Sequence, residues 1–279
     1  MREYPKISIV TVTYNCMDTV EQTICNVLKQ TYPNIEYIII DGASTDGTKE
    51  IIEKYADRLA YWISEPDKGI YDAMNKGIKA ATGEWILFRN SGDYFFKPTT
   101  VEDVFKWYED HGEGIITGGK RVFEHNGYFD AYPNTTPSEK YWDKARFSHP
   151  ATFIRCQLQK RNPFPENLKI AGDFYFFCTM MKAGCRSICY PHIIALFDGE
   201  TGFSAQNRQQ SFKEILYVIQ SLGASPEDLL QLKKKYRRAS RLCVLLKYIK
   251  RIGLLNRLYR KAKYPNWTFM PKKEILSNI

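Results

Sequence analysis

The sequence predicts an α/β fold: a Rossmann-like, mainly parallel β-sheet flanked by helices and followed by a helical, basic C-terminal extension. Short β-branched apolar runs alternate with segments whose apolar residues recur every three or four positions, which is typical of βα units in a parallel sheet. The chain has 279 residues, 44% of them hydrophobic, which allows one substantial core and an appendage. We therefore expect a domain at residues 1–208 and an extension at residues 209–279.

The first half of the chain is expected to supply parallel strands at residues 6–14, 35–41, 59–63 and 84–89. Helices are expected between these strands, at residues 18–28, 45–57 and 69–81. Beyond residue 93 the pattern predicts a helix at 99–110, a strand at 114–119 and a hairpin-like region that reaches residue 147. A helix at 172–184 and a strand at 185–197 complete the domain, and such antiparallel additions are common in mainly parallel sheets.

The positive charge of the chain lies in its C-terminal part. The whole chain has a net charge of +9, whereas residues 229–279 contain fifteen Lys or Arg and one acid, so this segment carries +14 and the remainder −5. Helices are expected at 209–222 and 226–262. In the second of these helices, apolar side chains recur at helical spacing, and basic side chains take the other side. The apolar residues are Leu242, Leu245, Ile249, Ile252, Leu255 and Tyr259. We expect an amphipathic basic helix.

The cysteines and the N-terminal residues indicate the cellular compartment in which the protein is expected. The seven cysteines include no CxxC pair, and their odd number suits a reducing compartment. Cys185 and Cys189 lie four residues apart, but no second pair completes a zinc site, so packing in the core is expected. The first residues show no signal-peptide pattern, and no window reaches the ~18 to 20 uncharged apolar residues of a membrane-spanning helix. We expect a cytoplasmic protein.

Four segments carry a resemblance to a known family. In chain order they are ISIVTVTYN at residues 7–15, IIIDGASTDGT at 38–48, SEPDKGIYDAMNKG at 64–77 and ILFRNSGDYF at 86–95. Their order and domain-scale spacing resemble family 2 glycosyltransferases over about residues 5–205. The resemblance implies a GT-A fold, an inverting transfer of a sugar from a nucleotide-sugar, which we expect to be UDP-linked, and a Mg²⁺ or Mn²⁺ cofactor.

The resemblance assigns the nucleotide to the ends of the first two strands. Thr13, Tyr14 and Asn15 match the family's base and ribose pocket, and Asp41 matches the acid that accepts a hydrogen bond from the base. The carboxyl ends of parallel strands share one ligand-binding edge, which suits this assignment. For Asp41, a turn-capping aspartate before Gly42 is the alternative.

Polar residues after the third strand form a second candidate group. Asp67 and Lys68 precede the expected helix at 69–81, and Asp72 and Asn75 lie in its first turns. We interpret Asp72 and Asn75 as contacts to the ribose, diphosphate or sugar of the donor. A solvated helix start is the alternative for the whole group.

Asp93 matches the last acid of the family's metal-binding DxD-type motif. Gly92 stands at the partner position, so the segment Asn90-Ser91-Gly92-Asp93 offers a single carboxylate. Mg²⁺ is often held by one or two carboxylates together with substrate phosphates and waters, so the resemblance still implies a metal that neutralises the leaving diphosphate. Asn90 is expected to contact the nucleotide-sugar. A scaffold with a lapsed active site is the alternative that Gly92 raises.

Sugar transfer also needs a base that takes the proton of the acceptor hydroxyl. Asp173, in the segment IAGDFYFF, matches the family's catalytic base at the start of a helix, and an ordinary helix N-cap is the alternative. His149, in SHPATF, resembles a His-containing segment common in the family before the acceptor region. A contact to phosphate or acceptor and a purely structural role both remain open for His149.

Together these features predict an inverting hexosyltransferase that acts on a hydroxyl of a glycan or lipid-linked glycan in cell-surface polysaccharide synthesis. The charge and aromatic residues of the tail raise a rival class, a nucleic-acid-binding protein. An apolar stripe along one helical face instead favours an anionic bilayer. We therefore expect peripheral binding to the cytoplasmic face of the membrane and no nucleic-acid partner. Docking of the stripe on the domain or on a second subunit is the alternative.

Overall fold

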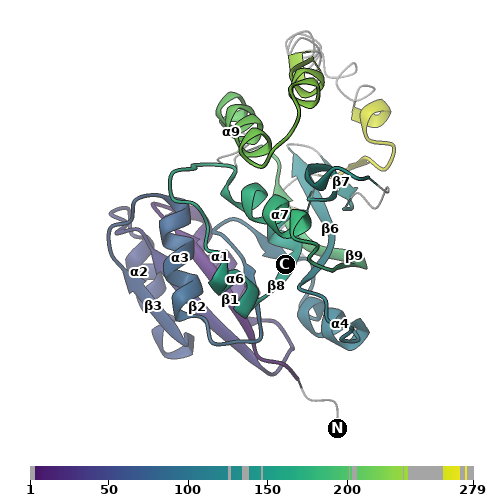
Figure 1. The fold of residues 1–279 in the computed structure, drawn as a ribbon. Helices are drawn as coiled ribbons and strands as arrows, with labels where there is room; N and C mark the ends of the chain where they lie inside the picture. Colours follow the sequence, from purple (N-terminus) through teal and green to yellow (C-terminus); the bar gives the residue numbers. More distant parts are fainter. Residues whose placement is uncertain are drawn as a thin grey trace.

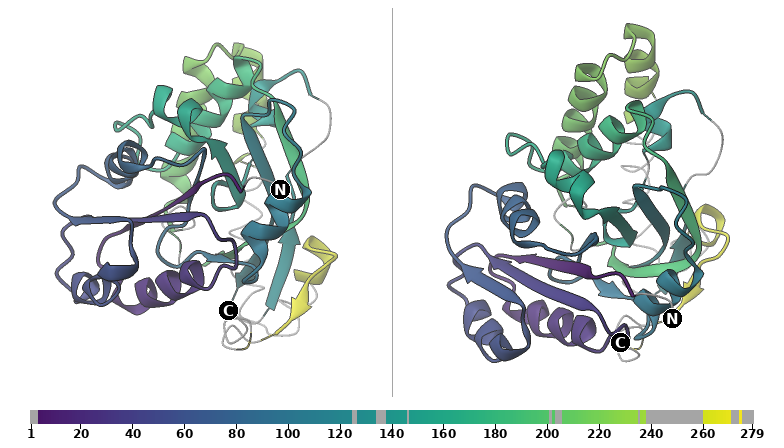
Figure 2. Two further views of the ribbon diagram at one scale, coloured as in Figure 1. Left: turned by 90° about the horizontal axis from the view of Figure 1, so that it is seen from below. Right: turned by 60° about the horizontal axis from the view of Figure 1, so that its bottom comes forward.

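The computed structural model describes residues 4–124, 127–133, 138–145, 147–200, 202, 206–234, 236–237, 260–270 and 274. Within these residues ten strands form one sheet, whose main path runs β10-β7-β6-β8-β4-β1-β2-β3, while β9 pairs with β5 and β6. Helices lie on both faces of the sheet (Figures 1 and 2). The predicted α/β class is confirmed, with a parallel N-terminal half and antiparallel additions.

The parallel half consists of β1 (Ile7–Thr13), β2 (Ile35–Asp41), β3 (Tyr61–Ser64) and β4 (Trp85–Phe88). β1 lies between β2 and β4, and β3 lies beyond β2. The register places Thr13 beside Asp41, and Asp41 beside Ser64. The carboxyl ends of these strands therefore meet at one edge, where α/β folds bind their ligands.

The helices around this half are α1 (Met17–Leu28), α2 (Thr48–Glu53) with the 3-10 turn η1 (Ala56–Arg58), α3 (Ile70–Ala80) and α4 (Thr100–Trp107). Alternate side chains of β1 point to opposite faces of the sheet. Val10 packs in the core that contains α3, whereas Ile9 packs in the core formed with α1 and α4. Each fully buried side chain of this kind contributes about 1.5–3 kcal/mol, so the strands are anchored from both faces.

Several elements differ in length from the prediction, and two of these differences have a clear local cause. The helix expected at 45–57 begins only at Thr48, because Gly47 has a φ of +102° and Asp46 Oδ1 accepts hydrogen bonds from the Thr48 N–H and hydroxyl at 3.0 and 2.6 Å. The strand expected at 114–119 continues to Glu124, because its outer part pairs with β7 in a hairpin.

The second half of the sheet contains β5 (Tyr94–Phe95), β6 (Ile115–Glu124), β7 (Gly127–Ala131), β8 (Thr152–Arg155) and β9 (Ser187–Asp198). β8 pairs antiparallel with both β4 and β6. The sequence did not predict β8 or the short helices near it, which are α5 (Tyr141–Lys144), η2 (His149–Ala151) and α6 (Cys156–Arg161). These elements place His149 against Phe88 at the end of β4.

The described parts of the C-terminal extension pack on the rest of the chain. α9 (Arg208–Ser221) lies beside α7 (Gly172–Lys182), and it buries Val218 and Ile219 in the same core as α3 (Figure 1). β10 (Thr268–Phe269) pairs with β7, and Arg260 forms an ion pair with Glu124.

The helix predicted at 226–262 is described only in part. Residues 226–234 are helical, whereas the apolar stripe at 242–259 lies outside the described residues. Among the helices that the structure describes, none is long and apolar enough to span a bilayer. The division of the chain at residue 208 stays a prediction.

Candidate active site

The end of β2 places Asp41 at the ligand-binding edge. Its side chain is fully buried, and its carboxylate accepts hydrogen bonds from the Ser44 N–H and hydroxyl at 3.0 and 2.5 Å and from the Ser64 hydroxyl at 2.6 Å. These bonds tie the loop after β2 to the end of β3. They are turn-organising contacts, and a hydrogen bond from a nucleobase to Asp41 stays a prediction.

The three residues predicted at the end of β1 lie beside this loop. Asn15 has a left-handed φ of +49°, its N–H donates to Ser44 Oγ at 2.8 Å, and its Oδ1 accepts from the Thr45 N–H at 3.0 Å. Tyr14 is 63% exposed. Thr13 Oγ1 is buried and has no hydrogen-bond partner within the described part of the chain. The structure thus brings all three residues to the same edge as the end of β2.

Asp67 is a further acid at this edge. A Cβ added to Gly42 would lie 2.4 Å from Asp67 Oδ2 and 3.3 Å from Tyr14 Cδ2. The absence of a side chain at Gly42 therefore lets the Asp67 carboxylate approach the backbone next to the exposed Tyr14 ring. An aromatic ring beside a carboxylate suits a nucleobase, which offers a flat π face and N–H donors.

Asp72 and Asn75 make contacts within the protein. Asp72 Oδ2 accepts a hydrogen bond from the Lys68 N–H at 3.0 Å and lies 3.7 Å from Lys76 Nζ. The buried amide of Asn75 exchanges two hydrogen bonds of 2.9 Å with the backbone of Phe164. Asp72 thus holds the start of α3 and Asn75 fixes the loop at Phe164, and contact of either residue with a donor stays a prediction.

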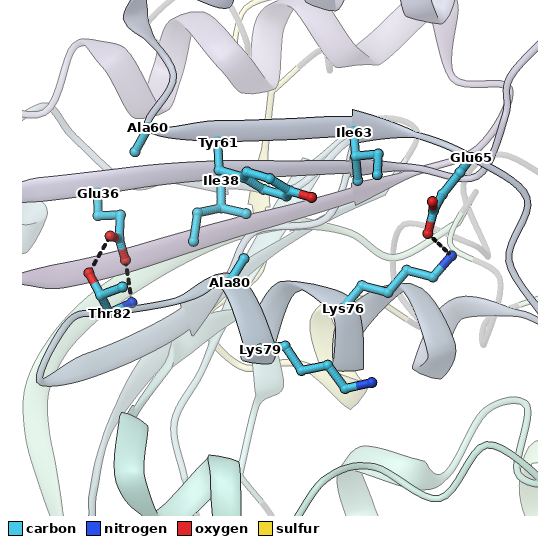
Figure 3. A pocket seen from close by; sticks show the side chains of 10 residues that line it. All are labelled: Glu36, Ile38, Ala60, Tyr61, Ile63, Glu65, Lys76, Lys79, Ala80 and Thr82. Atoms are coloured by element: carbon cyan, nitrogen blue, oxygen red, sulfur yellow. Dashed lines mark hydrogen bonds and ion pairs between the residues drawn. The ribbon is translucent and has the colours of Figure 1, made fainter.

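A groove of about 570 Å³ lies between α3 and the outer strands β2 and β3 (Figure 3). Lys76 points toward Glu65 and pairs with it at 2.8 Å, while Glu36 accepts a hydrogen bond from the Thr82 N–H at 2.7 Å (Figure 3). None of the predicted site residues lines this groove. It is therefore separate from the strand ends where those residues gather.

The segment after β4 forms a turn that favours glycine at position 92, which the resemblance takes as the partner position of Asp93. The Asp93 N–H donates to the Asn90 carbonyl at 2.9 Å, which closes a four-residue turn. Gly92, the third residue of this turn, has a φ of +90°, and its N–H donates to Thr23 Oγ1 at 3.0 Å. A side chain at position 92 would strain the backbone. The turn therefore delivers one carboxylate, that of Asp93.

Asp93 is partly buried, and its pKa responds both to burial and to the charges of nearby groups. Burial raises the pKa of Asp93 to about 6, against the opposing charges of Arg89 and Lys120. Arg89 is fully buried, its Nη1 donates to the Tyr94 carbonyl at 3.2 Å, and its guanidinium lies 4.0 Å from the centroid of the Phe95 ring. Its Nε and Nη2 have no partner among the residues that the structure describes. Arg89 thus contributes a buried positive charge whose attraction for the Asp93 carboxylate opposes the effect of burial.

Lys120 is a functional candidate that the sequence did not reveal. It lies on β6, and its Nζ is 4.6 Å from the centroid of the Phe197 ring. Burial lowers the pKa of Lys120, while the charges of Asp93 and Asp173 act in the opposite direction. The charges of both predicted acids thus favour the charged form of Lys120. The signal was a lysine inside a mostly apolar strand, but the predicted strand ended one residue before it.

His149 belongs to the same group of residues. Its buried ring stacks on Phe88 with centroids 5.1 Å apart, and its Nε2 has no hydrogen-bond partner in the described residues. Burial lowers the pKa of His149, and the charge of Asp173 opposes that shift. The His149 ring is thus held between Phe88 and Phe164, and the lowered pKa favours its neutral form.

Asp173 lies in the first turn of α7. Its Oδ1 accepts hydrogen bonds from the Phe174 N–H at 2.8 Å and from the Tyr71 hydroxyl at 3.2 Å. Tyr71 is almost fully buried, and burial raises its pKa above the ordinary value, so the hydroxyl stays protonated. Asp173 therefore has features of both interpretations, a helix-start contact and a place beside the other candidate residues.

A family model described as glycosyl transferase family 2 matches residues 8–190, which is more than half of the chain. The chain belongs to glycosyltransferase family 2. An uncharacterized glycosyltransferase of Mycobacterium tuberculosis is 40% identical over 102 residues, a match that covers 36% of this chain and 39% of that protein. The chain thus spans about two fifths of that relative's length.

Solved structures of other glycosyltransferases share the fold of this family 2 chain. The Staphylococcus aureus protein TarS, residues 1–349 in complex with UDP-GlcNAc, superposes with a TM-score of 0.61 at 20% identity and covers 81% of this chain and 70% of that chain. A mannosyltransferase from Pyrobaculum calidifontis in complex with GDP-Man and Mn²⁺ also gives a TM-score of 0.61 at 20% identity, covering 83% and 70%. These likenesses confirm the GT-A fold.

The side chains of this family 2 glycosyltransferase suit a metal that is shared with the donor. Within the described residues no group of three or more His, Cys, Asp or Glu is placed to hold a metal ion. Asp93 offers a carboxylate, and Asn90 Oδ1 is buried without a hydrogen-bond partner among the described residues. Oxygen ligands of this kind fit Mg²⁺ or Mn²⁺, provided that phosphates and waters complete the coordination.

Proposed function

We propose that this family 2 glycosyltransferase moves a sugar from a UDP-linked donor to a hydroxyl of a glycan or lipid-linked glycan, with inversion at the anomeric carbon. The observation that carries the proposal is the edge formed by the ends of the parallel strands, which brings together Thr13, Asn15 and Asp41. Asp93 and Asp173, whose expected roles lie on the donor side and the acceptor side, both act to raise the pKa of the partly buried Lys120 on β6. The structure of TarS with UDP-GlcNAc supports a UDP-linked donor.

In the proposed reaction Asp173 takes the proton of the acceptor hydroxyl while its oxygen attacks the anomeric carbon. The bond from that carbon to the diphosphate breaks in the same step, and the nucleoside diphosphate leaves. Within the described residues both side-chain hydrogen bonds of Asp173 go to Oδ1, which leaves Oδ2 to receive the proton. The contact to Tyr71 orients the carboxylate for this transfer.

The leaving diphosphate gathers negative charge, which the donor side has to stabilise. Asp93 and Asn90 would hold Mg²⁺ or Mn²⁺, and the metal, when bound, neutralises part of that charge. Arg89 and Lys120 add two positive charges fixed by the fold. Thr13, Tyr14, Asn15 and Asp41 would hold the nucleoside, with His149 near the acceptor.

A donor panel tests the proposed function. We expect UDP-sugars to raise the melting temperature more than GDP-sugars, and Mn²⁺ to enlarge this shift, because the metal and the diphosphate complete each other's contacts. Slow hydrolysis of the matching UDP-sugar should accompany binding. Binding without hydrolysis or transfer to any glycan acceptor would instead identify a lapsed scaffold.

The basic tail supports a second part of the proposal, peripheral association with the cytoplasmic face of the membrane. Residues 229–279 carry a net charge of +14, and each Lys or Arg close to an anionic bilayer contributes about 1 kcal/mol. A lipid-linked acceptor would be presented at that surface.

Charge substitution tests the membrane contact better than deletion does, because β10 pairs with β7 and a deletion would remove it. We expect the protein to sediment with vesicles rich in phosphatidylserine and to detach at high salt. Lys247→Gln, Lys250→Gln and Arg251→Gln together should weaken sedimentation, whereas Lys49→Gln with Lys54→Gln, two exposed lysines of the N-terminal half, should not. Unchanged sedimentation of the triple variant would favour docking of the tail on the protein itself.

A further inference from the structure

Glu214 is a buried carboxylate in the part of the chain that the family model does not match. The model ends at residue 190, and Glu214 lies on α9 with only 6% of its surface exposed. Its carboxylate accepts hydrogen bonds from the backbone N–H groups of Lys169 at 3.1 Å, Ile170 at 2.8 Å and Ala171 at 3.0 Å. Gln210 Nε2 donates a fourth, at 2.9 Å. One side chain of α9 thus binds three consecutive N–H groups of a loop.

This loop leads directly into the candidate base. α7 begins at Gly172, and Asp173 follows it. The single hydroxyl hydrogen of Tyr71 is shared between the Ile170 carbonyl at 2.8 Å and Asp173 Oδ1 at 3.2 Å, and the Asp173 N–H donates to the same hydroxyl oxygen at 3.3 Å. Glu214 and Tyr71 therefore hold the loop from two sides, one through its N–H groups and one through its carbonyl and Asp173.

The close packing at Gly172 makes this arrangement specific. A Cβ added to Gly172 would lie 2.7 Å from ring atoms of Tyr71, so the loop approaches the tyrosine as closely as a glycine allows. The other side of the loop is fixed by α9, since Val218 and Ile219 of that helix share a core with Phe176 and Phe177 of α7. Movement of α9 would therefore move the start of α7.

The ionisation of Glu214 agrees with a structural charge. Burial raises the pKa of Glu214, but the hydrogen bonds from Gln210 and from the backbone of residues 169–171 outweigh it, so the pKa lies below the ordinary value. A carboxylate held by three N–H groups at the start of a helix is a strong, directional contact, because charge-assisted hydrogen bonds are about twice as strong as neutral ones.

We propose that Glu214 is a positioning residue for Asp173, so that α9 of the C-terminal extension completes the acceptor side of the active site. The proposal rests on the proposed function, in which Asp173 is the base. Glu214 touches no reacting atom. It acts by fixing the backbone from which Asp173 projects, while Tyr71 fixes the carboxylate.

The test compares Glu214→Gln with Glu227→Gln, a matched change at an exposed glutamate. The amide keeps the shape of the side chain but replaces one acceptor oxygen with an NH₂ group that faces backbone donors. We expect kcat to fall by about 10- to 100-fold, since small displacements of a catalytic group are costly, while UDP-sugar affinity stays within about twofold. Glu227→Gln should leave both quantities unchanged.

A double-mutant cycle with Asp173→Asn separates positioning from general structure. If Glu214 acts through Asp173, Glu214→Gln should cause no further loss of kcat in the Asp173→Asn background. The proposal is overturned if the double variant loses kcat by the product of the two single losses, or if Glu214→Gln has a wild-type kcat. If Glu214→Gln does not fold, Tyr71→Phe removes only the hydroxyl on the other side of the loop. Tyr71→Phe should lower kcat without changing donor affinity. A wild-type kcat in this variant would overturn the proposal that Glu214 and Tyr71 together position Asp173.

The same cycle tells which proposal has failed. A wild-type kcat for Asp173→Asn would show that Asp173 is not the base, and the positioning role of Glu214 would fail with it. A large loss for Asp173→Asn combined with wild-type activity of Glu214→Gln and Tyr71→Phe would leave the proposed function intact and overturn the positioning role alone.

Discussion

The proposed donor side of the site, at the ends of the parallel strands, and the proposed base side, around Asp173, are assembled in different ways. On the donor side Asp41 bonds to Ser44, three residues later, and to Ser64, at the end of the adjacent strand. On the base side the contacts join distant parts of the chain: Tyr71 bonds to Asp173, 102 residues away, and the Ala171 N–H bonds to Glu214, 43 residues later.

This difference decides which substitutions act at a distance. Strand register brings the donor-side residues together, so a change there should disturb nucleotide binding locally. The base side depends on three helices, α3, α7 and α9, that meet only in the folded protein. A change far from Asp173 in sequence should therefore alter the chemical step and leave donor binding intact.

The largest expected effect is that of Asp173→Asn. The amide keeps the shape and an oxygen for the Phe174 N–H, which Asp173 accepts at 2.8 Å, but it does not take up the acceptor proton. We expect kcat to fall by roughly 10²- to 10⁴-fold while donor affinity and melting temperature stay near those of the wild type. Single-turnover kinetics and calorimetry measure these quantities. Equal losses of rate and donor affinity, or a large fall in melting temperature, would mean that Asp173 is only a structural cap.

The second effect tests the donor side through Asp93→Ala. Loss of this carboxylate should reduce kcat by about 10²- to 10³-fold, because a charge that stabilises the leaving diphosphate is weakened. Mn²⁺ should also lose most of its ability to enhance thermal stabilisation by a UDP-sugar, a readout that does not need turnover. Asp57→Ala, at an exposed acid in η1, is the control. Unchanged metal dependence in Asp93→Ala would show that the metal lies elsewhere.

The meeting of the proposed donor-side residues at one sheet edge was largely predictable, because these residues lie in contiguous motifs at strand ends. Asp41, Thr13 and Asn15 follow apolar runs, and parallel strands bring such positions to one edge. The motifs do not reveal which hydrogen bonds an acid makes, so the contacts of Asp41 with Ser44 and Ser64 became visible only in the structure.

On the proposed base side, the sequence predicted the position of Asp173 at a helix start but not the residues that hold its loop. A helix-start aspartate is visible in the sequence, but the partners of its loop are set by the packing of α9 on α7. In the sequence, Glu214 is one polar residue of an amphipathic helix. Lys120 directly follows the predicted strand. The role of neither residue can be inferred from its neighbours in sequence, because that role depends on which distant element packs against the residue.

Gly92→Asp tests whether the turn after β4 tolerates a second acid next to Asp93. Gly92 has a φ of +90°, and nothing lies within 4 Å of an added Cβ, so the cost comes from the backbone and not from a clash. We expect the free energy of unfolding to fall by about 1–3 kcal/mol, without stronger metal binding. Denaturant titration and Mn²⁺ titration measure the two outcomes. A variant as stable as the wild type that binds Mn²⁺ more tightly would contradict the turn argument.

The smallest effect concerns the far end of the donor-side strands, where Glu36 of β2 accepts hydrogen bonds from Ser8 and Thr82 and pairs with Lys6 at 2.7 Å. Burial raises the pKa of Glu36, but these partners outweigh burial and lower it to about 2, from an ordinary value of 4.5. Because the folded pKa is depressed, the stabilisation from Glu36 is complete above pH 4.5 and is lost as the pH falls toward 2.

Glu36→Gln should therefore lower the melting temperature at pH 7 and flatten its decline between pH 4.5 and pH 2, the window set by the pKa of Glu36. Glu50→Gln, at an exposed position of α2, is the matched control and should leave the acid limb of the melting curve as steep as in the wild type. Because Glu36 lies at the opposite end of β2 from Asp41, donor affinity of the folded variant should not change. A steep acid limb retained in Glu36→Gln would assign the acid sensitivity to other carboxylates, and a loss of donor affinity would show that the two ends of the donor-side strands are coupled.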